Sequence, residues 1–496
     1  MDRIRDIYQS FSKSEVRYLK NYLIAFHTKG ENKSLALIEL LEKHPKVTQA
    51  EAAEKLYGNA KSKAFLMLKS RLLDKMLETL SLSINLQNNP TIKADPAAFA
   101  SIQLYKDMTA AWLLRRRGMG KLAGELLKSC LKEADAADLP EFSLLALVQL
   151  RNLSRSESEV VNDLTPAIQE SQAQFATDLM GIEVFDLFRV KSANQSVLKD
   201  ESIAFFEERL KELENRLDEA YSVRAHYYYL ALKVQLNEGN DGYEAGKAAL
   251  LELIELVEST PSLQAKNRLG TPYLRLAGIE MLGGNYQAAM RASGKALDLL
   301  QKKKNNYLSA LLYRIFACMY CGEMALAEVA WESAQWFIER GKGGTSLDIL
   351  HYLRSSMLYI QGDFKGAIFA LGDVKNLFSD KSGWNSALRI HEIQLLIDRD
   401  HLDTTMSRIE TLRKHLTRYK GEARQDLMYK FLTHLERQSF DFSALTPEME
   451  HLLQQLEAPE SWSSVSPEVI RFDVWARAKA TDRGFYPLLL ETLGTM

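Results

Sequence analysis

The chain has 496 residues, of which 46% are hydrophobic and 26% charged, and its formal net charge is −2 at pH 7. A nearly neutral chain has no global attraction to nucleic acid or acidic membranes, and this length exceeds one ordinary compact core. The chain has only three cysteines, which excludes a disulfide framework. It shows no apolar signal segment and no apolar run long enough to span a membrane, so we expect a cytoplasmic protein without membrane contact.

Residues 1–85 are predicted to form a small helical module. Ser12 with Glu15, and Thr48 with Glu51, each have the spacing of a capping box, so a helix should begin after Ser12 and after Thr48. Further helices are expected at 34–43 and at 60–81, where apolar residues recur at helical spacing. We expect this module to serve for docking or dimerisation.

The same module also supports a second hypothesis. A helix at 48–57, a turn at Gly58 and the following helix are similar in arrangement to a helix-turn-helix, whose second helix contacts DNA. Residues 1–85 hold 15 Lys and Arg against 10 Asp and Glu, whereas the rest of the chain holds 48 against 55. The candidate nucleic-acid contacts are Lys61, Lys63, Lys69 and Arg71.

A linker is predicted at 86–98, and a helical repeat of about 40 residues is predicted over 99–458. Proline is absent between Pro272 and Pro447, which suits uninterrupted helices. Such a period predicts stacked helix pairs, because one pair cannot bury its apolar face alone. The turns are expected near Gly118, Ser158, Asp200, Gly242, Gly284, Gly322, Gly362, Asp400 and Asp441.

Three segments share all or part of one pattern. Its first helix holds a large residue, a leucine and a small residue, and a Gly-x-Tyr turn and two alanines follow. One full set is Tyr273, Leu276, Ala277, Gly284, Tyr286, Ala289 and Ala296. Partial sets are Gly322, Met324, Ala327 and Ala334, then Gly362, Phe364 and Ala367. These residues resemble the tetratricopeptide-repeat (TPR) superfamily, although Arg314 and Arg354 replace the first-helix leucine and the period exceeds 34.

The resemblance implies an all-α fold, a right-handed α-solenoid of antiparallel helix pairs, with the N-terminal module at 1–85. Residues 459–496 are expected to form a helical cap on the end of the stack, with Pro467 at the first position of a helix. The resemblance also implies a non-catalytic scaffold that binds a protein or peptide partner in its concave groove, or that self-assembles through its repeat surface.

The groove candidates are aromatic and arginine side chains on first helices. Three successive tyrosines on one helix cannot all face one core, and one arginine recurs per repeat. Such arginines could bind an acidic or C-terminal peptide, or they could instead cross the interfaces between repeats. The groove candidates are Arg224, Tyr227, Tyr228, Arg275, Arg314 and Arg354.

Catalytic, metal and cofactor sites are not predicted. The Cys318-x-x-Cys321 pair lacks the two further ligands of a zinc site, and a helical position is atypical of a redox motif. The nine histidines are scattered, and an enzyme would need a buried cluster around His351 or His391. The alternative to a scaffold is therefore a transcription regulator, with DNA bound by 1–85 and a peptide or small effector sensed by the repeats.

Overall fold

The computed structural model describes residues 2–27, 31–83, 95–154, 158–193, 200–237, 243–302, 305–342, 346–374, 383–419, 423–464 and 466–495. Within these ranges the regular secondary structure is helical throughout, without a strand, so the all-α prediction is confirmed. The chain divides into two compact units, Met1–Ala94 and Asp95–Met496.

The first unit is a helical module with its own core. Its buried centre includes Leu19, Ile38 and Phe65. Both predicted capping boxes form, with Ser12 and Thr48 as N-caps, and the last helix begins and ends slightly later than expected. The helices are α1 (Asp2–Ser10), α2 (Lys13–Ala25), α3 (Lys33–Lys43), α4 (Gln49–Tyr57) and α5 (Lys63–Ser83).

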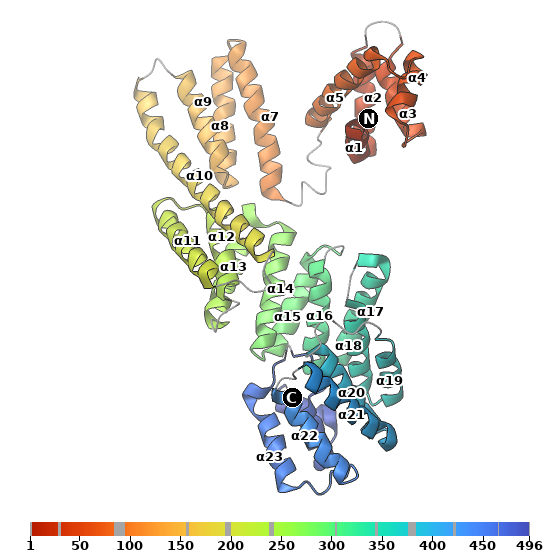
Figure 1. Cartoon of the computed structure of the whole chain (residues 1–496). Helices are drawn as coiled ribbons and strands as arrows, with labels where there is room; N and C mark the ends of the chain where they lie inside the picture. Colours follow the sequence, from red (N-terminus) through yellow and green to blue (C-terminus); the bar gives the residue numbers. More distant parts are fainter. Residues whose placement is uncertain are drawn as a thin grey trace. The chain divides into compact units, whose positions relative to one another are not determined.

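The second unit is a stack in which each helix packs mainly on its neighbours in the sequence (Figure 1). Its first part consists of α7 (Pro96–Arg116), α8 (Gly120–Ala136), α9 (Pro140–Leu153), α10 (Ser158–Ala193), α11 (Asp200–Glu219), α12 (Val223–Asn237) and α13 (Tyr243–Ser259). The pairs that follow are α14 (Lys266–Leu282) with α15 (Tyr286–Leu299), α16 (Asn305–Tyr320) with α17 (Met324–Phe337), α18 (Ser346–Ile360) with α19 (Phe364–Gly372), α20 (Trp384–Asp398) with α21 (Leu402–Tyr419), and α22 (Ala423–Arg437) with α23 (Pro447–Glu457).

Glycine turns separate the two helices of several pairs. Gly118, Gly284, Gly322 and Gly362 have φ of +78°, +73°, +82° and +82°, a left-handed conformation that favours glycine. Asp400 takes the same conformation at its predicted turn, with φ of +60°. These turns confirm the predicted turn positions at 118, 284, 322, 362 and 400, while Gly242 lies outside the described residues.

The predicted helix pairing is wrong between 158 and 200, although α10 begins at Ser158 and α11 begins at Asp200, at the two predicted turns. Each predicted turn lies between the two helices of a pair, so turns near Ser158 and Asp200 would leave two helices between them. The single helix α10 occupies this interval instead and runs for 36 residues. It continues past Pro166, and it contacts α12 closely at Gly181, where an added Cβ would lie 3.1 Å from the Ala225 Cα. A helix of this length spans about 54 Å and can pack on α9, α11 and α12 in turn.

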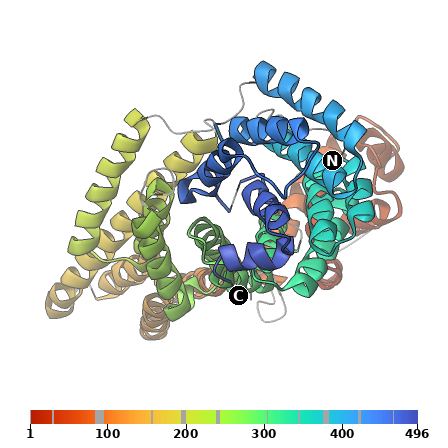
Figure 2. The ribbon, with the colours of Figure 1, turned by 90° about the horizontal axis from the view of Figure 1, so that it is seen from below.

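The C-terminal prediction needs two corrections. The helix expected to begin at Pro467 is absent, since residues 466–471 form no helix and α24 (Phe472–Ala480) begins later, followed by α25 (Phe485–Thr492). Residues 459–464 and 466–495, here called the C-terminal segment, pack on α23, the last helix of the repeats, but are not confined to the end of the stack. In Figure 2 they lie inside the curve that the repeats form.

Candidate functional site

The concave side of the stack, here called the inner surface, holds the C-terminal segment against the first helices α14, α16, α18, α20 and α22. Side-chain hydroxyls bind backbone carbonyls across this contact. Tyr352 in α18 donates to the carbonyl of Pro467 at 2.9 Å, which satisfies backbone outside a helix. Tyr486 donates to Met319 at the end of α16 at 2.7 Å, and Ser464 donates to Met281 in α14. The inner surface therefore already carries a polypeptide.

Arg424 in α22 is the main polar anchor of the C-terminal segment. Its guanidinium binds Glu468 in a bidentate pair, with Nε–Oε2 at 2.6 Å and Nη2–Oε1 at 2.9 Å. The same group donates to Asp473 Oδ1 at 2.7 Å, to Ser461 Oγ at 2.6 Å and to the Leu456 carbonyl at 2.6 Å. The Arg424 side chain is only 10% exposed, so these ion pairs are little screened by solvent.

A second arginine completes this buried charge cluster. Arg471 pairs with Asp473 and lies over the Trp462 ring, with 4.6 Å between the guanidinium carbon and the ring centroid. Burial raises the pKa of Glu468, although Arg424 opposes that shift. Each carboxylate thus has an arginine partner, as buried charges require.

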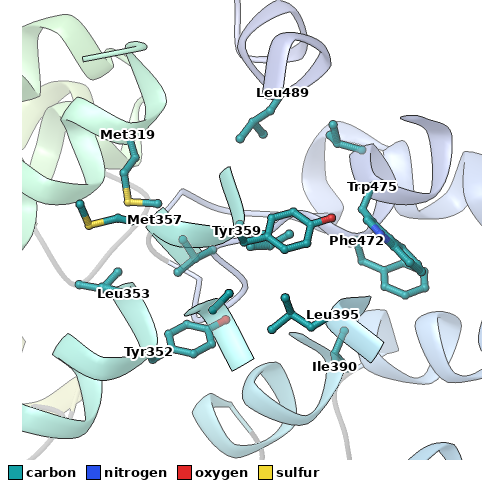
Figure 3. Close-up of a cluster of buried hydrophobic side chains, with 14 of the residues drawn as sticks. Met319, Tyr352, Leu353, Met357, Tyr359, Ile390, Leu395, Phe472, Trp475 and Leu489 are labelled. Carbon is teal, nitrogen blue, oxygen red and sulfur yellow. The ribbon is translucent and has the colours of Figure 1, made fainter. Parts of the chain in front are cut away.

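Apolar side chains fill the remaining contact between the segment and the repeats (Figure 3). Trp475 and Phe472 from α24, and Leu489 from α25, share one buried cluster with Tyr359 of α18 and Leu395 of α20. The Trp475 indole and the Tyr359 hydroxyl both donate to Asp398, at 3.1 and 2.6 Å. The segment is consequently part of the core of the repeats from α14 to α23.

A buried polar cluster does surround His391, but its geometry does not suit catalysis. His391 Nε2 lies 3.0 Å from Ser355 Oγ, and that hydroxyl donates to the Ala367 carbonyl at 2.8 Å. The rings of Tyr352 and Tyr359 flank the imidazole, which is 1% exposed. Burial lowers the pKa of His391 to about 3, so the imidazole is neutral at pH 7. A substrate cannot reach either side chain, and the pair joins α18 to α20.

Two of the predicted groove residues line one pocket of about 420 Å³ on the earlier repeats. Tyr227 comes from α12 and Arg275 from α14, and α10 contributes Phe185 and Arg189. Burial raises the pKa of Tyr227, although the positive charges of Arg268 and Arg275 oppose that shift. We call this site the arginine pocket; its remaining lining residues are Ala231, Val234, Gln235, Leu253, Thr271, Pro272 and Asn306.

Arg224 and Tyr228 lie nearby but serve other contacts. Arg224 binds Asp178 of α10 with Nε–Oδ2 at 2.8 Å and Glu141 of α9 with Nη2–Oε2 at 2.6 Å. Ser222 also donates to Asp178, whose side chain is fully buried. Tyr228 packs on Phe185 with ring centroids 5.3 Å apart. Arg224 thus joins three helices, as the interpretation of arginines crossing interfaces predicts.

Arg314 and Arg354 are separated from the arginine pocket. Arg314 donates to the carbonyl of Met290 in the neighbouring pair, so it also crosses an interface. Arg354 pairs with Glu328 and lies over the Trp331 ring. It lines another pocket, of about 310 Å³, together with His351. Of the four predicted groove arginines, only Arg275 therefore lines the arginine pocket.

The candidate nucleic-acid residues do not share one helix face. Lys61, Lys63 and Arg71 are exposed, whereas Lys69 is half-buried and donates to Gln49 at 2.5 Å. At about 100° per residue, Lys69 and Arg71 in α5 point to opposite sides of the helix.

The thiol of Cys318 is unreactive, and the described residues contain neither a cluster of metal-ligand side chains nor a helix that could span a membrane. Burial raises the pKa of Cys318 to about 11, so its thiol stays protonated at pH 7 and is a poor nucleophile. The described part of the chain has no group of three or more His, Cys, Asp or Glu side chains placed to hold a metal ion. Nor does any described helix have the length and apolar character to cross a membrane.

Comparison of the sequence with known protein families gives no match, and comparison with curated proteins also gives none. The TPR resemblance therefore stays a prediction, carried by the repeat residues and by the helix pairs with their glycine turns. The handedness of the stack likewise stays a prediction.

Proposed function

We propose that this protein is a non-catalytic, TPR-like scaffold that binds a protein partner through the inner surface of its helical repeats. The observation that carries the proposal is the C-terminal segment itself. Tyr352 and Arg424 of the repeats, and the Met319 carbonyl that accepts from Tyr486, hold an extended stretch and two short helices by the means that repeat proteins use for peptides.

The partner should bind the earlier repeats. Between α14 and α23 the inner surface is occupied by residues of the chain itself, and their buried ion pairs make displacement costly. The arginine pocket lies on α10, α12 and α14 and combines aromatic walls with charged side chains, a composition typical of binding sites. Tyr and Arg are also the residue types that contribute most to binding at protein interfaces.

A transcription regulator is not our proposal. Its main feature would be one basic face on α5, and the helical positions of Lys69 and Arg71 distribute the charge around that helix instead.

Affinity purification of the full chain from its native lysate, with and without nuclease, tests the scaffold proposal. We expect a stoichiometric protein partner that survives nuclease, is retained by Arg291→Glu and is lost with the combined change Tyr227→Ala and Arg275→Glu. Arg291 is exposed on α15, outside the arginine pocket, so it controls for the change in net charge. Recovery of nucleic acid alone, abolished by deletion of residues 1–94, would favour the regulator.

A further inference from the structure

Resting on the scaffold proposal, we infer that the arginine pocket binds an acidic peptide segment that inserts an aromatic side chain. The charge of its lining is the first reason. Arg189 and Arg275 contribute two positive charges, and none of the described residues that line the pocket is Asp or Glu. Arg189 has a carboxylate neighbour in Asp186, at 3.7 Å, but these side chains are 69% and 62% exposed. Such an exposed pair contributes little and can exchange for a ligand carboxylate.

The walls of the arginine pocket supply the second reason. Phe185 and Tyr227 are half-buried aromatics, and Val234 and Leu253 form a buried apolar floor. A volume of about 420 Å³ accommodates an indole or phenyl ring with part of the adjoining backbone. The side-chain amides of Gln235 and Asn306 lie at the same pocket and can bind peptide carbonyls or N–H groups.

The inner surface of the later repeats gives an internal precedent. There the C-terminal segment presents Trp462 and Phe472 close to Glu468 and Asp473, and Arg424 receives both carboxylates. An aromatic side chain next to carboxylates, bound by an arginine of a first helix, is thus a combination that this fold already recognises. Arg275 and Tyr227 also lie on first helices, and they offer an arginine and a neighbouring aromatic side chain to such a ligand.

A peptide fits these observations better than a nucleic acid. The unit that contains the pocket has 47 Lys and Arg against 55 Asp and Glu, so its overall field repels a long polyanion that extends beyond the pocket more than it repels a short acidic segment. A second pocket in this unit, lined by Asp135, Asp138 and Glu170 with no Lys or Arg among its described lining residues, would repel an acidic ligand. The described lining of the arginine pocket is therefore positive in a unit whose net charge is negative.

Fluorescence anisotropy with defined probes tests this inference on the full chain. The ligand probe is a labelled peptide of about ten residues in which glutamates flank a central tryptophan. One comparison peptide replaces the glutamates with lysines, another replaces the tryptophan with alanine, and a thymidine oligonucleotide of similar charge represents nucleic acid. Protein variants are Arg275→Glu, Arg189→Glu and Tyr227→Ala, with Arg291→Glu as the matched control, and circular dichroism melts verify that each is folded.

We expect only the acidic tryptophan peptide to bind tightly. Arg275→Glu should weaken it by about tenfold or more, and Arg189→Glu, at a more exposed position that tolerates change, by several-fold. Arg291→Glu should leave the affinity unchanged. The inference is overturned if the acidic peptide does not bind, if the lysine peptide or the oligonucleotide binds as tightly, or if both arginine variants keep full affinity. Recovery of a nuclease-resistant partner that depends on Tyr227 and Arg275 would then still support the scaffold and reject only its acidic ligand.

Discussion

Arg424 shows how one buried side chain can hold two distant parts of the chain together. Its partners Glu468 and Asp473 follow it by 44 and 49 residues, and all three side chains are at most 10% exposed. Removal of the arginine would leave the Glu468 carboxylate without its arginine partner, and would leave Asp473 with Arg471 alone, in a medium that solvates charge poorly.

We expect Arg424→Ala to lower the free energy of unfolding by about 3 to 5 kcal/mol, because the buried Glu468 carboxylate is left uncompensated. Arg424→Lys should cost less, since it keeps the charge but loses the bidentate geometry. Urea denaturation measures both, and limited proteolysis should cut the Arg424→Ala protein first within the C-terminal segment. Equal stability of the alanine variant and the wild type would show that the cluster contributes nothing.

The buried His391 side chain predicts that the free energy of unfolding depends on pH. Its folded pKa of about 3 lies below the usual value of 6.5, because the imidazole is buried. As the pH falls below 6.5 the unfolded chain gains a proton here that the folded chain does not, so folding loses stability until about pH 3. From pH 7 to pH 5 this loss is about 2 kcal/mol.

The variant His391→Gln isolates this contribution, because glutamine can donate to Ser355 but does not titrate. Urea midpoints of both proteins at about pH 7 and pH 5 give the comparison. The variant should be less stable at pH 7, where its fit is poorer, and should lose less stability on acidification. A parallel loss in both proteins would place the pH dependence in other groups.

At the scale of elements, the glycine turns set where each helix pair reverses. Gly362 has φ of +82° and open space around its Cα, so the backbone conformation alone favours glycine there. Gly372, the last residue of α19, has an ordinary helical conformation and also has open space. The two positions differ in backbone conformation and little else.

Opposite effects of alanine are therefore expected at these glycines. Gly362→Ala should destabilise the protein by about 1 to 2 kcal/mol, because an L side chain is strained at positive φ. Gly372→Ala should stabilise it by about 0.4 to 1 kcal/mol, because the unfolded chain loses freedom. Thermal and urea midpoints of both variants provide the measurement. A stabilising Gly362→Ala would mean that the left-handed turn is absent in solution.

At the scale of the whole molecule, the division at residue 94 predicts independent folding. The first unit buries apolar residues from each of its five described helices, among them Leu37, Leu72 and Met76. We expect residues 1–94 alone to be helical by circular dichroism and to unfold cooperatively. A chain of residues 95–496 should keep its own thermal transition. A first unit that is unfolded in isolation would contradict this expectation.

Deletion of the C-terminal segment tests whether this segment is a permanent part of the core or a bound ligand that can exchange. Deletion of 459–496 would expose the apolar surface that Trp475, Phe472 and Leu489 cover. We expect the truncated chain to bind a hydrophobic dye, to elute as aggregates and to lose cooperative unfolding. A monomeric truncated chain that melts cooperatively and binds a separate 459–496 peptide would instead identify the segment as an exchangeable ligand.

The sequence alone determined the features that depend on neighbouring residues. A capping box joins residues three apart, and a left-handed turn depends on one glycine, so Ser12, Thr48, Gly284, Gly322 and Gly362 could all be located correctly. Helical periodicity likewise indicated the all-α class. The same local signals were too weak over 158–200, where a period imposed from other repeats gave two helices in place of α10.

The position of the C-terminal segment and the set of arginines that share a pocket depend on contacts between residues far apart in the sequence. Ser464 contacts Met281 across 183 residues, and Arg224 binds Glu141 across 83. No local pattern records such pairings, because they depend on the curvature of the stack and on which helix faces are already covered. Tyr227 and Arg275 were therefore recognisable from the sequence as candidates, whereas their common pocket with Phe185 and Arg189, and the filling of the later inner surface, were not.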